Sequence, residues 1–160
     1  MKKLITPILL AAIALSSPAP AQATEEQSPP SEACDQAMQS SLTRIQSIKN
    51  LKVEDSGRYE SMPEGAPSGS TGRYYVYLSG RGGVDLMKSP KLMGTIAENI
   101  IKSCNATIFT FGQYRSAYGI TFGIFEDGVI RQFKCMEDEY PDFEPRSGVK
   151  IPYGYSVCNL

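Results

Sequence analysis

Histidine is absent from this chain of 160 residues. Because His is the commonest general base, the usual partner of a Ser or Cys nucleophile and the commonest metal ligand, its absence removes the most frequent catalytic arrangements. Positive charge is not in surplus either, since 16 Lys and Arg residues stand against 17 Asp and Glu residues. A phosphate backbone would attract a basic surface. We therefore predict no nucleic-acid partner.

Long apolar runs are scarce, and the one clear example lies within residues 1–23. Lys2 and Lys3 precede the apolar residues 4–15, and Ala21-Gln22-Ala23 is a small-residue cleavage site, as in a secretory signal peptide. The run is shorter than the roughly 20 apolar residues that span a bilayer. We predict a signal peptide over 1–23 and a flexible leader over 24–30. Residues 31–160 are then a single globular domain, secreted or periplasmic and without an integral membrane span.

Cys-x-x-Cys motifs are also absent, which argues against a zinc ribbon or a thioredoxin-like redox site. The four cysteines (Cys34, Cys104, Cys135, Cys158) are an even number in a chain predicted to be exported, which favours two disulfides. Four cysteines can pair in three ways. We favour Cys34 with Cys104, because one would begin a helix and the other would end one. Cys135 with Cys158 would then hold the C-terminal tail.

Two segments have apolar residues at helical spacing. The first predicts a helix over 32–49, with Ser31 as its N-terminal cap and Cys34 on the buried face. The second predicts a helix over 90–103 or 90–104. It begins at Ser89-Pro90, where Ser can cap and Pro suits the first helical position, and Asn105 can end it.

Strands are predicted over 73–79 and 106–114, and in a hairpin around Asp127-Gly128. A two-residue type I′ turn at this dipeptide would place Ile124 opposite Arg131. One buried face would then collect the apolar residues of the hairpin, leaving Arg131 as a misfit on it. Those residues are Ile120, Phe122, Ile124, Val129, Phe133 and Cys135.

Residues 55–72 are rich in Gly, Pro and Ser, and predict a long surface loop. Residues 140–160 are too broken by Pro and Gly for more than a short terminal strand. The order is helix, strand, helix and three strands. It predicts an α+β two-layer sandwich, with two helices on one face of a mostly antiparallel sheet of about four strands and an irregular, disulfide-tethered C-terminal tail.

Acidic side chains offer the main enzymatic alternative. Glu137, Asp138 and Glu139 lie in an acidic run, and Glu126 and Asp127 lie at the hairpin turn. Paired carboxylates can hydrolyse glycosides when an apolar pocket keeps one of them protonated, so a small hydrolase of envelope polymers is the alternative function. The run has no apolar flank and is better interpreted as solvated surface. We predict no catalytic, cofactor-binding or metal-ligating residues.

The nine tyrosines favour recognition. Strand alternation places Tyr75 and Tyr77 on one face, and a tyrosine offers both apolar area and a polar tip. Arg81 follows in a glycine-rich turn whose N–H groups could also bind an anion. The predicted recognition surface is Tyr75, Tyr77 and Arg81. Our hypothesis is an exported, non-enzymatic module that recognises a protein or a glycan, and a purely structural envelope component is a further alternative.

Five short motifs in residues 73–160 combine a helix start, cysteines and a hairpin. They are Ser89-Pro90-Lys91-Leu92-Met93, Ile100-Ile101-Lys102-Ser103-Cys104, Phe122-Gly123, Phe133-Lys134-Cys135 and Tyr153-Gly154-Tyr155-Ser156-Val157-Cys158. Over about residues 73–160 the chain resembles small exported cyanobacterial proteins of unknown function. The resemblance implies a common fold with paired cysteines in an envelope or extracellular setting. It implies no catalytic residue.

Overall fold

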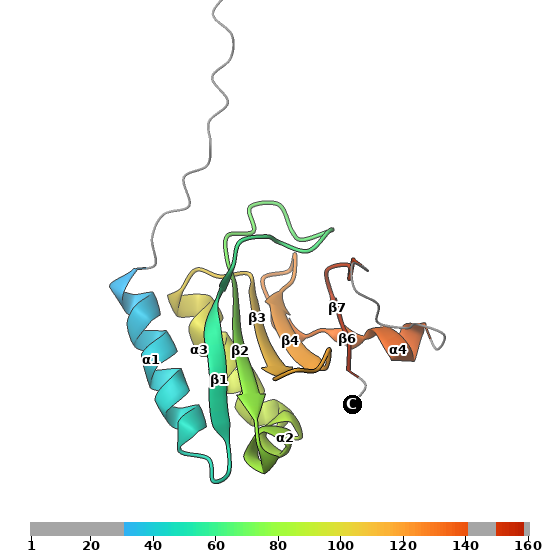
Figure 1. Ribbon diagram of the computed structural model, residues 1–160. Coiled ribbons are helices and arrows are strands. Elements are labelled where there is room, and N and C mark those ends of the chain that lie inside the picture. The colour runs from blue at the N-terminus through green and yellow to red at the C-terminus, as the bar shows by residue number, and fades with distance from the viewer. Residues whose placement is uncertain (1–30, 141–149, 159–160) are drawn as a thin grey trace, which may run out of the picture.

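The computed structural model describes residues 31–140 and 150–158, and the predicted signal peptide and leader lie outside them. The described chain has the predicted α+β class (Figure 1). Its elements are α1 (Glu32–Gln46), β1 (Lys52–Tyr59), β2 (Arg73–Ser79), α2 (Arg81–Met87), α3 (Pro90–Ser103), β3 (Ile108–Gln113), β4 (Gly119–Ile124), β5 (Ile130–Gln132), β6 (Lys134–Cys135), α4 (Met136–Glu139) and β7 (Tyr155–Ser156). None of the helices described is long and apolar enough to cross a membrane.

Five strands form the main sheet in the spatial order β1-β2-β3-β4-β5. Only β2 and β3 are parallel, so the sheet is mostly antiparallel, as predicted. A parallel pair needs a long crossover connection, and α2 and α3 supply it. The short strands β6 and β7 form a separate parallel pair near the C-terminal end.

The two long helices, α1 and α3, pack on the same face of the sheet and cover its alternate residues (Figure 1). Ser31 caps α1 as predicted, because its Oγ accepts a hydrogen bond from the Cys34 N–H at 3.3 Å. The core beneath the helices is apolar and aromatic. Its members include Ile45, Met93, Ile96 and Ile100 from the helices, and Val76, Leu78, Phe109, Phe111 and Phe122 from the strands.

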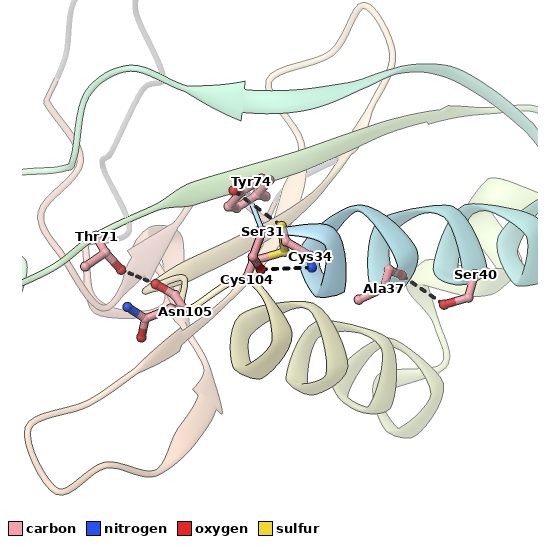
Figure 2. Close-up of a disulfide and its surroundings, with 8 residues drawn as sticks. All are labelled: Ser31, Cys34, Ala37, Ser40, Thr71, Tyr74, Cys104 and Asn105. Carbon is pink, nitrogen blue, oxygen red and sulfur yellow. Dashed lines mark hydrogen bonds between the residues drawn. A yellow bond between two sulfur atoms is a disulfide. The ribbon is translucent and has the colours of Figure 1, made fainter. Parts of the chain in front are cut away.

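Both favoured disulfides are present, and no described cysteine is free. Figure 2 shows that Cys34–Cys104 joins the first turn of α1 to the end of α3, next to Tyr74. Cys34 is 1% exposed, so this bond is part of the core. The Tyr74 hydroxyl lies 3.5 Å from Cys34 Sγ and must be the donor, because a bridged sulfur carries no hydrogen. The second disulfide, Cys135–Cys158, tethers the C-terminal tail.

The prediction of a loop over 55–72 was wrong in its first part, because β1 extends through Tyr59 and adds a fifth strand at the sheet edge. Apolar and polar residues do not alternate along β1, and its residues are half-buried or exposed. Its pairing with β2 holds it in the sheet. Gly57 lies opposite Tyr75, and a Cβ on it would come within 3.1 Å of the Tyr75 hydroxyl oxygen. The glycine therefore leaves space for the tyrosine ring, a common accommodation between strands.

The predicted hairpin register was wrong by one residue. Ile124 pairs with Ile130, and the Phe125 N–H donates to the Val129 carbonyl at 3.0 Å, so the loop has three residues. Only Gly128 has positive φ there, whereas a type I′ turn also needs it at Asp127. The Asp127 carboxylate instead accepts the Val129 N–H at 3.1 Å, which fits a type I turn followed by a glycine bulge.

The register change moves side chains between faces of the sheet. Val129 is 47% exposed, Phe133 is buried on the face opposite the helices, and Arg131 is exposed and paired with Asp127. The buried misfit predicted at Arg131 therefore does not exist.

Two smaller predictions also change. The turn predicted at Gly80-Arg81-Gly82-Gly83 is mostly the first turn of α2, and the Gly82 N–H donates to the Asn50 carbonyl at 2.9 Å. A Cβ on Gly82 would lie 2.4 Å from the Lys49 carbonyl oxygen, so this glycine serves close packing. Ser89 is the N-cap residue of α3 with Pro90 next to it, as predicted, but its side chain makes no cap hydrogen bond, and its hydroxyl donates to the Asp85 carbonyl at 3.2 Å.

Removing either disulfide is expected to lower the free energy of unfolding through loop-closure entropy. Cys34→Ala/Cys104→Ala opens a loop of 70 residues and should cost about 4 kcal/mol. Cys135→Ala/Cys158→Ala opens one of 23 residues and should cost about 3 kcal/mol. Urea unfolding of both double variants beside the oxidised protein measures these losses. Midpoints equal to that of the parent protein would contradict the expectation.

Candidate functional site

The face of the sheet that the helices leave uncovered carries a groove with a volume of about 770 Å³. Its floor is formed by β3 and β4, which contribute Ile108, Thr110, Gly112, Gly119 and Thr121. One wall is the segment after β1 (Ser61, Met62, Pro63, Glu64), and another is the C-terminal tail (Ile151, Tyr155, Ser156, Val157). We call this feature the sheet groove.

The tail wall is fixed in place by backbone hydrogen bonds as well as by Cys135–Cys158. The Gly119 N–H donates to the Val157 carbonyl at 3.0 Å, which joins the tail to β4. The Tyr153 N–H donates to the Glu64 carbonyl at 2.8 Å, which joins the two walls to each other. The groove is therefore bounded by segments that are distant in sequence and tied together.

Three tyrosines, Tyr59, Tyr75 and Tyr77, stack at the β1–β2 side of this face, and we call them the tyrosine cluster. The Tyr59 and Tyr75 ring centroids are 4.5 Å apart, and those of Tyr75 and Tyr77 are 5.2 Å apart. The Tyr59 and Tyr77 hydroxyl oxygens are 2.6 Å apart and share a hydrogen bond. Burial, followed by this hydrogen bond, raises the pKa of Tyr59 above its usual range, so the hydroxyl keeps its proton.

Arg73 lies beside the cluster and contributes a positive charge to the sheet groove. Its guanidinium carbon is 4.2 Å from the centroid of the Tyr59 ring, a close cation–π contact. The Nε atom is buried and has no hydrogen-bond partner. Among the described residues, none forms a salt bridge with Arg73. The cation is thus positioned by an aromatic ring and not by a carboxylate.

Glycines on β3 and β4 leave room for aromatic rings that pack on the uncovered face of the sheet. A Cβ on Gly112 would come within 2.5 Å of the Tyr77 ring, and one on Gly123 within 2.4 Å of the Phe133 ring. Phe133 in turn packs against Phe125 and Tyr153 beneath the tail. These rings form a second, smaller apolar cluster that supports the tail wall.

The structure places the three predicted recognition residues differently. Tyr77 lines the sheet groove, whereas Tyr75 is not a lining residue and packs against the Tyr59 and Tyr77 rings on the same face, with its hydroxyl donating to Asp55 Oδ2 at 3.1 Å. Arg81 is exposed at the first position of α2 and is not a lining residue. The N–H groups proposed for anion binding beside it are used internally, since those of Gly82 and Gly83 bond to backbone carbonyls.

The candidate acidic residues lie outside the groove, at the hairpin turn and on α4. The Arg131 hydrogen bond lowers the pKa of Asp127, the opposite of what a general acid needs. The Glu137 carboxylate accepts the Cys158 N–H at 3.1 Å, and Glu139 pairs with Lys134 at 2.6 Å. Across residues 31–140 and 150–158, no group of three His, Cys, Asp or Glu side chains is arranged to hold a metal ion.

Sequence reasoning missed Tyr59, Arg73 and the hydroxyls of the groove floor. The predicted loop includes Tyr59, yet this residue lies directly opposite Arg73 in the β1–β2 register. The available signal was the alternation of Asp55, Gly57 and Tyr59, which matches the alternation of Tyr77, Tyr75 and Arg73 on the neighbouring strand.

Known proteins supply no direct parallel. The chain matches no protein-family model, no curated protein and no solved structure. The arrangement of the sheet groove therefore carries the functional argument.

Gly112→Ala is expected to destabilise the protein by about 1–3 kcal/mol, because its Cβ would displace the Tyr77 ring. Gly94→Ala is the matched control. Gly94 is inside α3, and a Cβ there would meet Phe122 at an ordinary 3.5 Å, so it should stabilise by about 1 kcal/mol. Urea unfolding measures both changes. Equal effects of the two substitutions would refute the close contact at Tyr77.

From the half-buried hydroxyl of Tyr153 we predict that the free energy of unfolding falls at alkaline pH. It donates to the Ile124 carbonyl at 2.6 Å, and burial raises its pKa from 10.0 to about 12. The folded form holds this proton more tightly than the unfolded form. The stabilisation is complete below pH 10 and is lost as the pH rises towards about 12.

The measurement is the free energy of unfolding across this pH range. Tyr153→Phe should cost about 1 kcal/mol at neutral pH and give a shallower alkaline decline. Tyr114→Phe, an exposed control, should behave as the parent protein does. An unchanged alkaline slope in Tyr153→Phe would exclude this assignment.

Proposed function

We propose that the protein is an exported, non-enzymatic binding module that holds a saccharide in the sheet groove. The observation that carries this proposal is the lining itself, which combines tyrosine rings with many hydroxyl groups. Beyond the tyrosines, hydroxyls come from Ser61, Thr110, Ser116, Thr121 and Ser156. Hydroxyls both donate and accept hydrogen bonds, and tyrosine rings offer a flat apolar surface. A sugar ring presents the same two features.

The shape of the described surface favours a glycan over a folded protein as the ligand. Large apolar side chains that are exposed in the described residues are Tyr114, Val129 and Tyr140, which lie on separate segments. A large contiguous apolar patch, which often marks a protein-binding surface, is therefore not present among the described residues. A concave site lined by rings and a few polar groups is typical of small ligands.

Binding is favoured over hydrolysis by the charges in the groove. Glu64 is the one carboxylate among its described lining residues, and Lys150 lies 3.6 Å from it. Hydrolysis of a glycoside by two carboxylates needs a second one on the other side of the scissile bond. With no histidine in the chain, other acid–base pairs are restricted as well.

Export is supported by the two disulfides together with the signal-like residues 1–23. Disulfides form and persist in oxidising compartments. We therefore place the protein outside the cytoplasm, in the periplasm or beyond the cell, where envelope glycans are available.

The test is calorimetric titration of the oxidised, secreted protein with a panel of neutral and acidic oligosaccharides. We expect saturable binding by at least one member. Tyr155→Ala should weaken that binding about tenfold, because a ring is lost from the tail wall. Tyr114→Ala is the control, because Tyr114 is exposed and lies outside the groove. The proposal fails if no sugar binds or if the two variants bind equally well.

A further inference from the structure

From the arrangement around Arg73 we infer that the sheet groove selects saccharides that carry a carboxylate, and that Arg73 binds this carboxylate. The inference rests on the proposed function and names the chemical class of its ligand.

The first argument is that the Arg73 guanidinium has no anionic partner among the described residues. An arginine has five N–H donors and no acceptor, and it normally pairs with carboxylates when it is partly buried. Arg73 is partly buried, its Nε has no partner, and it forms no salt bridge with the described residues. Because Nε is buried, a ligand in the groove would bind the Nη N–H donors, which have no hydrogen-bond partner among the described residues either. An acceptor on the ligand would satisfy these donors in place of water.

The second argument is that the guanidinium is already oriented. It lies 4.2 Å from the centre of the Tyr59 ring, and Tyr59 is itself stacked on Tyr75 and hydrogen-bonded to Tyr77. A planar guanidinium held in one orientation can form two parallel hydrogen bonds to a carboxylate. Little conformational freedom then remains to be lost on binding.

The third argument is the balance of donors and acceptors. The Tyr59 and Tyr77 hydroxyls have two hydrogens between them, and their mutual hydrogen bond uses one. One O–H therefore remains available as a donor next to Arg73. The groove carboxylate Glu64 is drawn to Lys150, at 3.6 Å. The guanidinium of Arg73 and this O–H are two neighbouring donors, which suits a ligand with an acceptor-rich anionic group.

The experiment compares matched acidic and neutral sugars by calorimetry at low salt. One pair is trigalacturonic acid and its fully methyl-esterified form, and the other is N-acetylmuramic acid and N-acetylglucosamine. We expect at least one acid to bind about tenfold more tightly than its neutral partner, as for a charge-assisted pair. The pair that shows the difference distinguishes a uronic acid from a lactyl-bearing amino sugar as the source of the carboxylate.

Variants assign the effect to Arg73. Arg73→Gln should reduce the affinity for the acid about tenfold and so abolish the difference in affinity between the acid and its neutral partner. Arg73→Lys should recover only part of the loss, because an ammonium lacks the planar fork. Arg81→Gln removes the same charge at an exposed position outside the groove and should have no effect. If Arg73→Gln fails to fold, the comparison of acid with neutral sugar on the parent protein still decides.

The outcomes separate the two proposals. Equal binding of acid and neutral sugars overturns the carboxylate inference and leaves the saccharide proposal standing. Equal loss of affinity in Arg73→Gln and Arg81→Gln also overturns it. Binding of none of the four sugars or of the wider panel overturns both. Preferential binding of a tripeptide with a free C-terminal carboxylate, compared with its amide, would show that the ligand is a peptide and overturn both.

Discussion

Both long helices pack on the same face of one sheet, and this asymmetry determines which side chains the other, uncovered face can carry. The covered face is filled by apolar side chains from alternate strand positions. The intervening positions on the uncovered face carry hydroxyls, glycines and tyrosines, which tolerate water. Within residues 31–140 and 150–158 no third layer closes that face, and the segment after β1 and the C-terminal tail border it. The sheet groove is the result.

The parts of the fold that depend on local pattern were predictable. The helical stripe from Cys34 onward, the Ser31 cap, the strand that became β2 and the disulfide pairing follow from residue spacing or from simple topology, and the structure confirms them. β1 was not predictable in this way. Its residues have little hydrophobic alternation, and they form a strand because Tyr75 and Tyr77 on β2 provide partners for Gly57 and Asp55.

At the hairpin, the wrong φ predicted for one turn residue shifts the register between the strands and so moves side chains to the opposite face of the sheet. The dipeptide Asp127-Gly128 suits two turn types, and only the register separates them. Arg131 on the buried face was the warning, because an unpaired buried cation is costly. In the register of the structure, Arg131 is exposed beside Asp127, and Phe133 lies on the face of the sheet that the tail borders. The candidate site was half predictable for the same reason. Alternation within one strand places Tyr77 and Arg73 on the same face, whereas the contact of Tyr59 with Arg73 depends on the pairing between two strands.

The tail wall has a consequence for when the protein becomes functional. That wall is closed by a sulfur–sulfur bond between Cys135 and Cys158, so its final geometry depends on chemistry that the reducing cytoplasm opposes. In a newly made chain whose cysteines are still reduced, the strands of the groove floor could form, but the tail wall would lack its covalent link. The disulfide thus makes the border of the groove dependent on an oxidising environment, whereas the sheet floor is formed without it.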